Sequence, residues 1–166
     1  MAPAGRGWLR AGRVGRPHGL DGSFYVVEPS PQLLGAGASV VLGDEALTIV
    51  RRAGTDKRPI VRLEGCEDRP AAEGLRNQEI WVPRTAAPEL EPDEWWADDL
   101  EGCTVRDGSI EVGTVRRLRS LPSCEVLEVQ RADDRELLVP FVRDAVREVD
   151  LERRVIDVDL KFLGEV

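Results

Sequence analysis

Histidine is almost absent from this chain of 166 residues, which contains one, His18, and a single tyrosine. Any nucleophile activated by an imidazole would therefore have to use His18. No serine or cysteine lies beside it in a nucleophile setting such as Gly-x-Ser-x-Gly. The sequence predicts that the protein is not an enzyme.

Cysteine is also scarce. Cys66, Cys103 and Cys124 are odd in number and widely spaced, a pattern that favours neither a disulfide framework nor a zinc site. We interpret them as small apolar residues of the interior. We expect no metal ion and no cofactor.

Long apolar segments are missing as well. The chain has no run of 18 apolar residues, so no transmembrane helix is predicted. Its beginning, residues 1–7, lacks the apolar core of a signal peptide. We therefore expect a cytoplasmic protein without membrane contact, and a monomer because nothing suggests an obligate dimer.

Neighbouring carboxylates are the remaining residues that could support acid–base chemistry. They occur at Asp98 and Asp99, at Asp133 and Asp134, and at Asp157 and Asp159. Turns and exposed strand faces favour such residues without any catalytic role, so a solvated surface is the preferred interpretation. A small hydrolase that uses these acids is the weakest hypothesis.

Charge is distributed unevenly along the chain. Residues 1–90 carry 12 Lys or Arg against 11 Asp or Glu, a net charge of +1, whereas residues 91–166 carry 11 against 20, a net charge of −9. An acidic region of this kind repels nucleic acid and attracts a basic protein. The two halves are therefore expected to face different partners.

Short segments of β-branched and aromatic residues recur in both halves, separated by glycine, proline or aspartate. This pattern predicts an all-β protein made of small β-barrels. Strands are expected at 9–14, 23–28, 39–42, 47–52, 60–64 and 79–82 in the first half, and at 103–106, 111–118, 125–131, 136–140, 146–149 and 155–160 in the second. One helix is expected at 69–76, with Asp68 as its N-cap.

The junction between the halves holds three prolines, Pro83, Pro88 and Pro92. A semi-rigid linker is predicted at 85–92, between a domain of residues 1–84 and a domain of residues 93–166. In the last strand of the second domain, Ile156, Val158 and Leu160 share one face, which we expect in the core. The opposite face carries the carboxylates of 157 and 159 and is expected in solvent.

The segment 12–27 combines unusual chemistry with a constrained backbone. Pro17 fixes its own φ, while Gly19 and Gly22 can supply positive φ, so a stiff turn is predicted. Arg16 and His18 flank the proline and would be held outward as contacts for phosphate or carboxylate. The alternative is an ordinary tight connection with solvated arginines.

The polar loop 53–59 is a second candidate contact region, because loops carry binding residues disproportionately. The candidate RNA contacts of the first half are Arg13, Arg16, His18, Lys57 and Arg58.

Trp95 and Trp96 are adjacent, follow the linker and are surrounded by acids. Neighbouring residues of an extended segment point to opposite faces, so one ring can anchor the core while the other is exposed or covers the junction. Both rings could instead be buried. The rival interpretation is a protein-binding hot spot, with the aromatic anchor rimmed by carboxylates.

Several of these motifs, in this order, resemble the bacterial ribosome maturation factor RimM family. The most specific is the Gly-Arg-x-x-x-Pro-His-Gly-Leu element that begins at Gly12. The others are Phe24–Val26, Glu67–Arg76, Asp93–Trp96 before Asp99–Gly102, Leu138–Val142 and Val149–Glu152. The resemblance spans nearly the whole chain.

The resemblance implies two β-barrels, an N-terminal one like those of translation factors and a C-terminal PRC barrel. It implies a non-enzymatic factor that assists 16S rRNA processing and assembly of the head of the 30S subunit, by binding a basic head protein, number nineteen of the small-subunit series. In the family an aromatic pair, usually two tyrosines, occupies the positions of Trp95 and Trp96 and matters for ribosome binding. The two tryptophans keep the aromatic surface, remove two hydroxyl groups and add two indole N–H donors.

The main hypothesis is therefore an assembly factor for the immature 30S subunit. Its acidic half would capture the head protein through Trp95, Trp96, Asp98 and Asp99, and its hairpin arginines would touch 16S rRNA. The alternative is a general RNA-binding β-barrel that acts through the N-terminal basic hairpin. The overall charge of −8 argues against that alternative.

Overall fold

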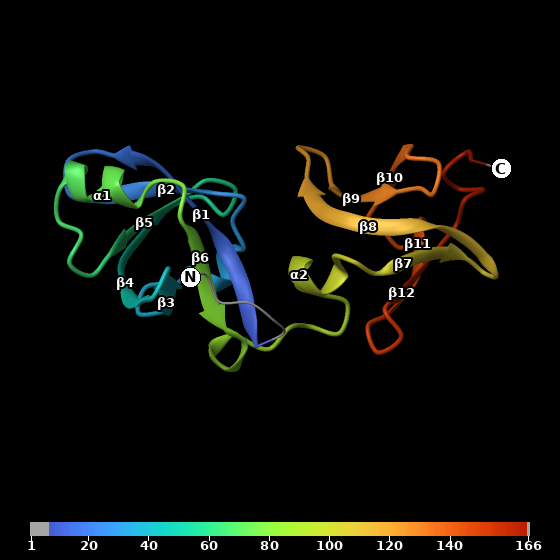
Figure 1. Cartoon of the computed structure of the whole chain (residues 1–166), viewed down its shortest axis with the longest axis horizontal. Helices are drawn as coiled ribbons and strands as arrows, with labels where there is room; N and C mark the ends of the chain where they lie inside the picture. The colour runs from blue at the N-terminus through green and yellow to red at the C-terminus, as the bar shows by residue number, and fades with distance from the viewer. Residues whose placement is uncertain (1–6, 166) are drawn as a thin grey trace. The chain divides into compact units, whose positions relative to one another are not determined.

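The computed structural model describes residues 7–165 and divides the chain into two compact units, residues 1–89 and 90–166 (Figure 1). Residues 1–6 and Val166 lie outside the described part. The expectation that the beginning of the chain lacks a signal peptide therefore concerns residues that are mostly not described. All of the expected strands are present, and the all-β prediction is confirmed. No helix within residues 7–165 is long and apolar enough to span a membrane.

The first unit is a closed barrel of antiparallel strands, which confirms the predicted barrel, and its strand order is β1-β2-β5-β4-β3-β6. Alternate side chains fill it, among them Phe24 and Val26 of β2 and Ile80 and Val82 of β6, because successive residues of a strand point to opposite faces. The strands are β1 (Trp8–His18), β2 (Ser23–Val27), β3 (Ser39–Leu42), β4 (Glu45–Gly54), β5 (Pro59–Leu63) and β6 (Glu79–Pro83).

Strand β1 extends beyond its expected end at Val14 and includes Pro17 and His18. The bend therefore consists of residues 19–22, and Arg16, Pro17 and His18 lie in the strand rather than in the predicted turn. The strand can continue through Pro17 because the register shifts between Val14 and Pro17. Such a bulge interrupts the hydrogen-bond ladder, so the missing N–H of proline is tolerated there.

Helix α1 (Arg69–Leu75) confirms the one helix expected from the sequence. Asp68 accepts a hydrogen bond from the Ala71 backbone N–H at 2.8 Å, which caps the first turn. Arg69 of this helix donates to the Gly19 carbonyl oxygen at 3.2 Å. Helix α1 is therefore tied to the β1–β2 turn.

The second unit is a six-stranded sheet in the order β10-β9-β8-β7-β12-β11. Its pairs are antiparallel except β12 with β7, which run parallel. Ile156, Val158 and Leu160 are buried in its core as expected, together with Leu127 and Val139. The strands are β7 (Thr104–Asp107), β8 (Ile110–Ser120), β9 (Glu125–Gln130), β10 (Glu136–Pro140), β11 (Val146–Asp150) and β12 (Val155–Val158).

A short helix, α2 (Ala97–Leu100), follows the two tryptophans and was not expected from the sequence. Leu100, its last residue, is fully buried in the core of the second unit. The Arg154 guanidinium donates to the Asp99 carbonyl oxygen at 2.9 Å and to the Glu101 carbonyl oxygen at 2.6 Å. These bonds satisfy carbonyl groups that the end of a helix leaves without partners.

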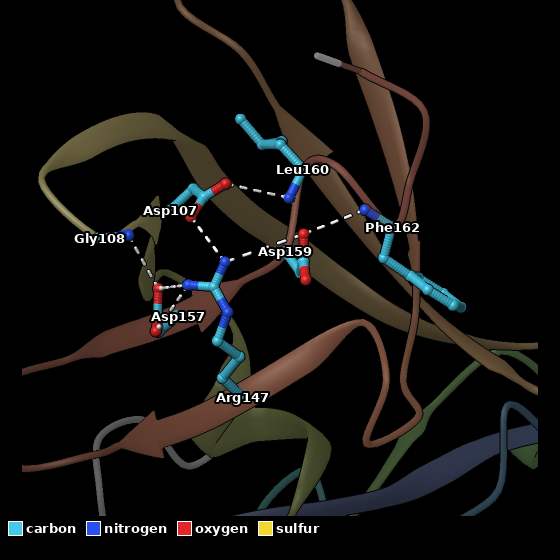
Figure 2. Close-up of polar contacts among 7 residues, drawn as sticks. All are labelled: Asp107, Gly108, Arg147, Asp157, Asp159, Leu160 and Phe162. Atoms are coloured by element: carbon cyan, nitrogen blue, oxygen red, sulfur yellow. Dashed lines mark hydrogen bonds and ion pairs between the residues drawn. The ribbon is translucent and has the colours of Figure 1, made fainter.

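The acidic face of β12 is not simply solvated, which corrects the expectation for Asp157 and Asp159. Figure 2 shows Arg147 of β11 directed at the carboxylates of Asp107, Asp157 and Asp159. The guanidinium lies 2.7 Å from Asp107, 3.2 Å from Asp157 and 3.9 Å from Asp159. One arginine thus links strands β11, β7 and β12 with the segment that follows β12.

The same carboxylates also accept backbone hydrogen bonds (Figure 2). Asp107 accepts from the Leu160 N–H at 3.1 Å, and Asp157 accepts from the Gly108 N–H at 3.0 Å. The hydrogen bond from Arg147 is the main cause that holds the pKa of Asp107 below its ordinary value, and the bond from Leu160 adds to it.

Replacement of Arg147 by glutamine is expected to make the second unit less sensitive to acid. A carboxyl group with a lowered pKa in the folded state stabilises fully above its unfolded pKa of about 3.9, and this contribution is lost as the pH falls through the folded value. The Arg147→Gln variant has lost the contact at every pH. Its melting temperature should therefore start lower and fall less than that of the wild type between about pH 6 and about pH 3, the range of carboxylate titration.

The matched control is Arg153→Gln, which removes the same charge from an exposed side chain whose nearest carboxylate, Asp150, is 3.8 Å away. Thermal denaturation followed by circular dichroism measures both variants. Equal acid sensitivity of the wild type and Arg147→Gln would contradict the role assigned to the Arg147 contacts.

Candidate functional site

Three of the five candidate RNA contacts converge on Tyr25. The Arg58 guanidinium carbon lies 4.3 Å from the centroid of the Tyr25 ring, and that of Arg16 lies 5.1 Å from it. His18 meets the ring edge-on with its centroid at 5.1 Å, and its Nδ1 is 3.0 Å from the Tyr25 hydroxyl. A cation over an aromatic face contributes about 0.5–1 kcal/mol at an exposed site. We call these four residues the Tyr25 cluster.

The bulge in β1 explains why Arg16 reaches this ring. Val14 is opposite Val26 and Pro17 is opposite Phe24, so Gly15 and Arg16 together face Tyr25. A Cβ on Gly15 would lie 2.8 Å from the Tyr25 carbonyl oxygen, which means that the two backbones approach too closely for any other residue. Bulges of this kind redirect side chains.

Arg58 reaches the Tyr25 ring from the side of β5, the other strand that is paired with β2. Tyr25 is paired with Ile60 of β5, and Arg58 lies two residues before Ile60. It is therefore the diagonal cross-strand neighbour of Tyr25, within reach of a long side chain. Tyr25 lies on β2, which is paired with β1 on one side and β5 on the other, and side chains from both sides contact its ring.

The remaining candidate RNA contacts are not part of this cluster. Lys57 is exposed in the loop between β4 and β5. Arg13 is half-buried in the middle of β1, where it lies opposite Val27 on one side and Glu79 on the other. The structure thus separates the five candidates into a group of three around an aromatic ring and two isolated cations.

Neither Arg16 nor Arg58 forms an ion pair with a carboxylate among residues 7–165, and both are exposed. In the adjacent strand β4, by contrast, Arg51 contacts Asp21 at 3.3 Å and Arg52 contacts Asp56 at 3.2 Å. The positive charge of the Tyr25 cluster is therefore uncompensated within the described residues, and such a cluster attracts anions.

The β1–β2 turn beside this cluster is fixed by contacts from elsewhere in the first unit. Asp21 accepts a hydrogen bond from the Ser23 backbone N–H at 3.0 Å. Hydrogen bonding with the Ser23 side chain, and then with its backbone, holds the pKa of Asp21 below its ordinary value, and the nearby Arg51 charge adds to this. Cys66 is buried against the turn, with its Sγ 3.3 Å from the Gly22 carbonyl oxygen. Contacts from Arg51, Cys66 and Arg69 therefore hold this turn in place in addition to its own residues.

The interior position expected for the cysteines is confirmed for two of them. Cys66 and Cys103 are buried, and burial raises the pKa of both thiols. Cys124 is only partly buried. The described residues contain no group of His, Cys, Asp and Glu that could hold a metal ion.

In the second unit, the two tryptophans differ in exposure. Trp96 is buried, with 8% of its surface exposed, whereas Trp95 is half-buried. Trp95 packs on the edge of the core, and its ring centroid lies 5.6 Å from that of Phe141 at a tilt of 58°. Of the pair, Trp95 keeps the larger surface for contact with a partner.

Asp98 and Asp99 lie in the first turn of α2, directly after the tryptophans. Both are half-buried. A carboxylate is favourable at this end of a helix because of the unpaired N–H groups there. Burial of Leu100 in the core and the hydrogen bond from Arg154 to the Asp99 carbonyl oxygen support the backbone that carries these carboxylates.

Sequence reasoning missed Tyr25, Phe141 and Arg154 as contributors to these surfaces. A signal for Tyr25 existed, since it is the only tyrosine of the chain and alternates with the buried Phe24 and Val26, which places it on the outer face. No comparable signal marked Arg154, whose partners are 53 and 55 residues away in the sequence.

Two family models match this chain in succession. The one described as RimM N-terminal domain matches residues 9–87, and the one described as RimM PRC barrel domain matches residues 97–162.

Curated relatives match over most of the chain. The ribosome maturation factor RimM of Sorangium cellulosum is 35% identical over 162 residues and covers 92% of this chain and 95% of its own. That of Streptomyces avermitilis is 39% identical over 162 residues, with 90% and 86% covered. Among solved structures, the N-terminal domain of RimM from Thermus thermophilus matches 51% of this chain and 98% of its own at 26% identity, with a TM-score of 0.44.

Proposed function

Because the chain belongs to the RimM family of non-enzymatic ribosome maturation factors, we propose that it assists assembly of the head of the 30S subunit and processing of 16S rRNA in the cytoplasm. Its acidic second unit would bind a basic small-subunit head protein, number nineteen of the series. Its first unit would contact the rRNA of the immature subunit through the Tyr25 cluster. The protein would hold the two components in register, which lowers the entropic cost of their later docking.

The distribution of charge is the observation that carries this division of labour. Residues 91–166 have a net charge of −9, which attracts a basic protein and repels RNA. Within the described residues, Arg16 and Arg58 lie over the ring of Tyr25 without a carboxylate partner, and they belong to the first unit. Each unit therefore suits a different class of partner.

The protein-binding surface that we propose is the segment from Trp95 to Asp99 with Phe141 beside it. Trp95 and Phe141 form an aromatic pair at the edge of the core, and Asp98 and Asp99 follow on α2. Aromatic anchors rimmed by charge are typical of binding hot spots. Leu100 and Arg154 hold the segment in place, so little further ordering is needed on binding.

Replacement of Trp95 by alanine is expected to weaken binding of the head protein about thirtyfold or more, because truncation of an aromatic hot spot typically costs about 2 kcal/mol or more. The double variant Asp98→Asn with Asp99→Asn should slow association and reduce the dependence of affinity on salt. Titration calorimetry and stopped-flow fluorescence on the full chain measure the two effects. Trp96→Ala is unsuitable because that side chain is buried.

The matched control is Asp133→Asn with Asp134→Asn, an adjacent acidic pair in the exposed turn between β9 and β10 that carries the same charge change. Unchanged affinity of Trp95→Ala, with its fold intact by circular dichroism, would refute the proposed surface. An equal loss in the Asp133 and Asp134 control would show that only the overall charge matters.

A further inference from the structure

We propose that Arg16, His18 and Arg58 form a binding site for the phosphodiester backbone of RNA, and that Tyr25 is the positioning residue of this site. The inference rests on the RNA-facing role proposed for the first unit and specifies what that site recognises. The juxtaposition that carries it is two exposed guanidinium groups, one from strand β1 and one from the loop between β4 and β5, both placed over one ring.

The ring of Tyr25 is occupied by protein groups rather than open to a nucleobase. Arg58 lies over it at 4.3 Å and Arg16 at 5.1 Å, and His18 meets its edge. Stacking of a base requires a free aromatic face. The groups left for a ligand are the N–H edges of the guanidinium planes, whose forked geometry matches phosphate oxygens.

These cations have no competing anion among the described residues. The other arginines beside them, Arg51 and Arg52, are bound to Asp21 and Asp56. The guanidinium groups of Arg16 and Arg58 instead lie over the neutral ring of Tyr25. A ligand phosphate would therefore not have to displace an internal carboxylate.

Tyr25 reduces the entropy that the two arginines would lose on binding. Long side chains that are free in solution must be immobilised in a complex, and each such side chain weakens binding. Here the ring holds both guanidinium groups before the ligand arrives. Its hydroxyl also engages His18 Nδ1 at 3.0 Å, which leaves Nε2 as the ring nitrogen available to a ligand. The three strands β1, β2 and β5 supply a rigid support.

Binding of a single-stranded oligouridylate to the full chain, measured by fluorescence anisotropy over a series of salt concentrations, tests the proposal. Tyr25→Leu keeps every charge but releases the arginines, so affinity should fall about three- to tenfold. Tyr25→Phe keeps the ring and should bind within about twofold of the wild type, since only the contact with His18 is lost. Arg16→Ala with Arg58→Ala should lower the slope of log K against log salt by about 1.4.

An abasic oligomer of the same length separates backbone from base recognition and should bind as tightly as the oligouridylate. Arg76→Ala is the control for charge, because Arg76 is an exposed arginine of the same unit that is paired with Glu73. Circular dichroism of each variant confirms that the fold is retained.

Unchanged affinity of Tyr25→Leu would overturn the positioning role. Loss of binding to the abasic oligomer would show that bases are recognised instead. Preference of the cluster for an acidic protein over both oligomers would replace RNA as the ligand. Binding of the head protein is a separate readout: its failure in the wild type would refute the protein-binding function, while the RNA titrations would still decide the phosphodiester site.

Discussion

Replacement of Gly22 by alanine is expected to destabilise the first unit by about 3–5 kcal/mol, the sum of backbone strain and overpacking. Gly22 has a φ of +94°, which residues with a Cβ adopt only under strain. An added Cβ would overlap the Cys66 carbonyl oxygen and lie 2.6 Å from its carbon and 2.9 Å from the Glu67 nitrogen. These are backbone atoms, so no side-chain movement can relieve the clash.

Gly19 provides the matched control within the same turn. Its φ is +70°, but a Cβ there would meet no atom within 4 Å. Gly19→Ala should therefore cost only the conformational strain, about 1–2 kcal/mol. Chemical denaturation measures both values, and hydrogen exchange of the β1 and β2 amides assigns the loss to the first unit. Equal destabilisation by the two variants would contradict the packing of Gly22 against Cys66 and Glu67.

The Gly22 result also bears on function. The turn at 19–22 connects the strand that carries Arg16 and His18 to the strand that carries Tyr25. If the clash opens the turn, the spacing between these strands changes and the arginines no longer share one ring. RNA binding by Gly22→Ala is therefore expected to fall at temperatures where the chain is still folded, and Gly19→Ala is expected to bind normally.

Replacement of Leu100 by alanine is expected to destabilise the second unit by about 2–5 kcal/mol, the usual range for a buried leucine. Leu100 is fully buried among Cys103, Val115 and the other core residues. It is also the only residue of α2 that is buried. The cavity left by alanine removes the apolar contact that holds this short helix on the sheet.

The matched control is Leu138→Ala in β10, because Leu138 is 43% exposed. Its loss should cost less than about 0.5 kcal/mol, as for most surface substitutions. Near-ultraviolet circular dichroism of Leu100→Ala should show weaker signals from Trp95 and Trp96, which precede α2. Equal effects of the two substitutions would mean that Leu100 does not anchor the helix.

Loosening of α2 should also weaken capture of the head protein. Asp98 and Asp99 lie on this helix, and a partner would have to order the segment again on binding. The effect should appear mainly as faster dissociation, since charge and therefore steering are unchanged.

The strands and the charge division followed from local features of the sequence. The positions of β-branched residues, glycines and prolines located all of the strands and helix α1. Alternation placed Ile156 and Val158 in the core because a period of two is a property of each strand alone. Helix α2 escaped detection because its four residues are too few for a helical pattern, and its stability comes from Leu100 and Arg154.

The sequence by itself determined which residues could bind, since Arg16, His18 and Arg58 were selected from their chemistry and their place beside turns and loops. Only the tertiary structure decided that all three side chains contact the ring of Tyr25. The convergence depends on a bulge opposite Tyr25, which forms when β1 and β2 pair, and on the pairing of β2 with β5, which is distant in the chain. Likewise, alternation predicted the acidic face of β12, but only the fold placed Arg147 against it, because register and cross-strand partners are set when strands pair.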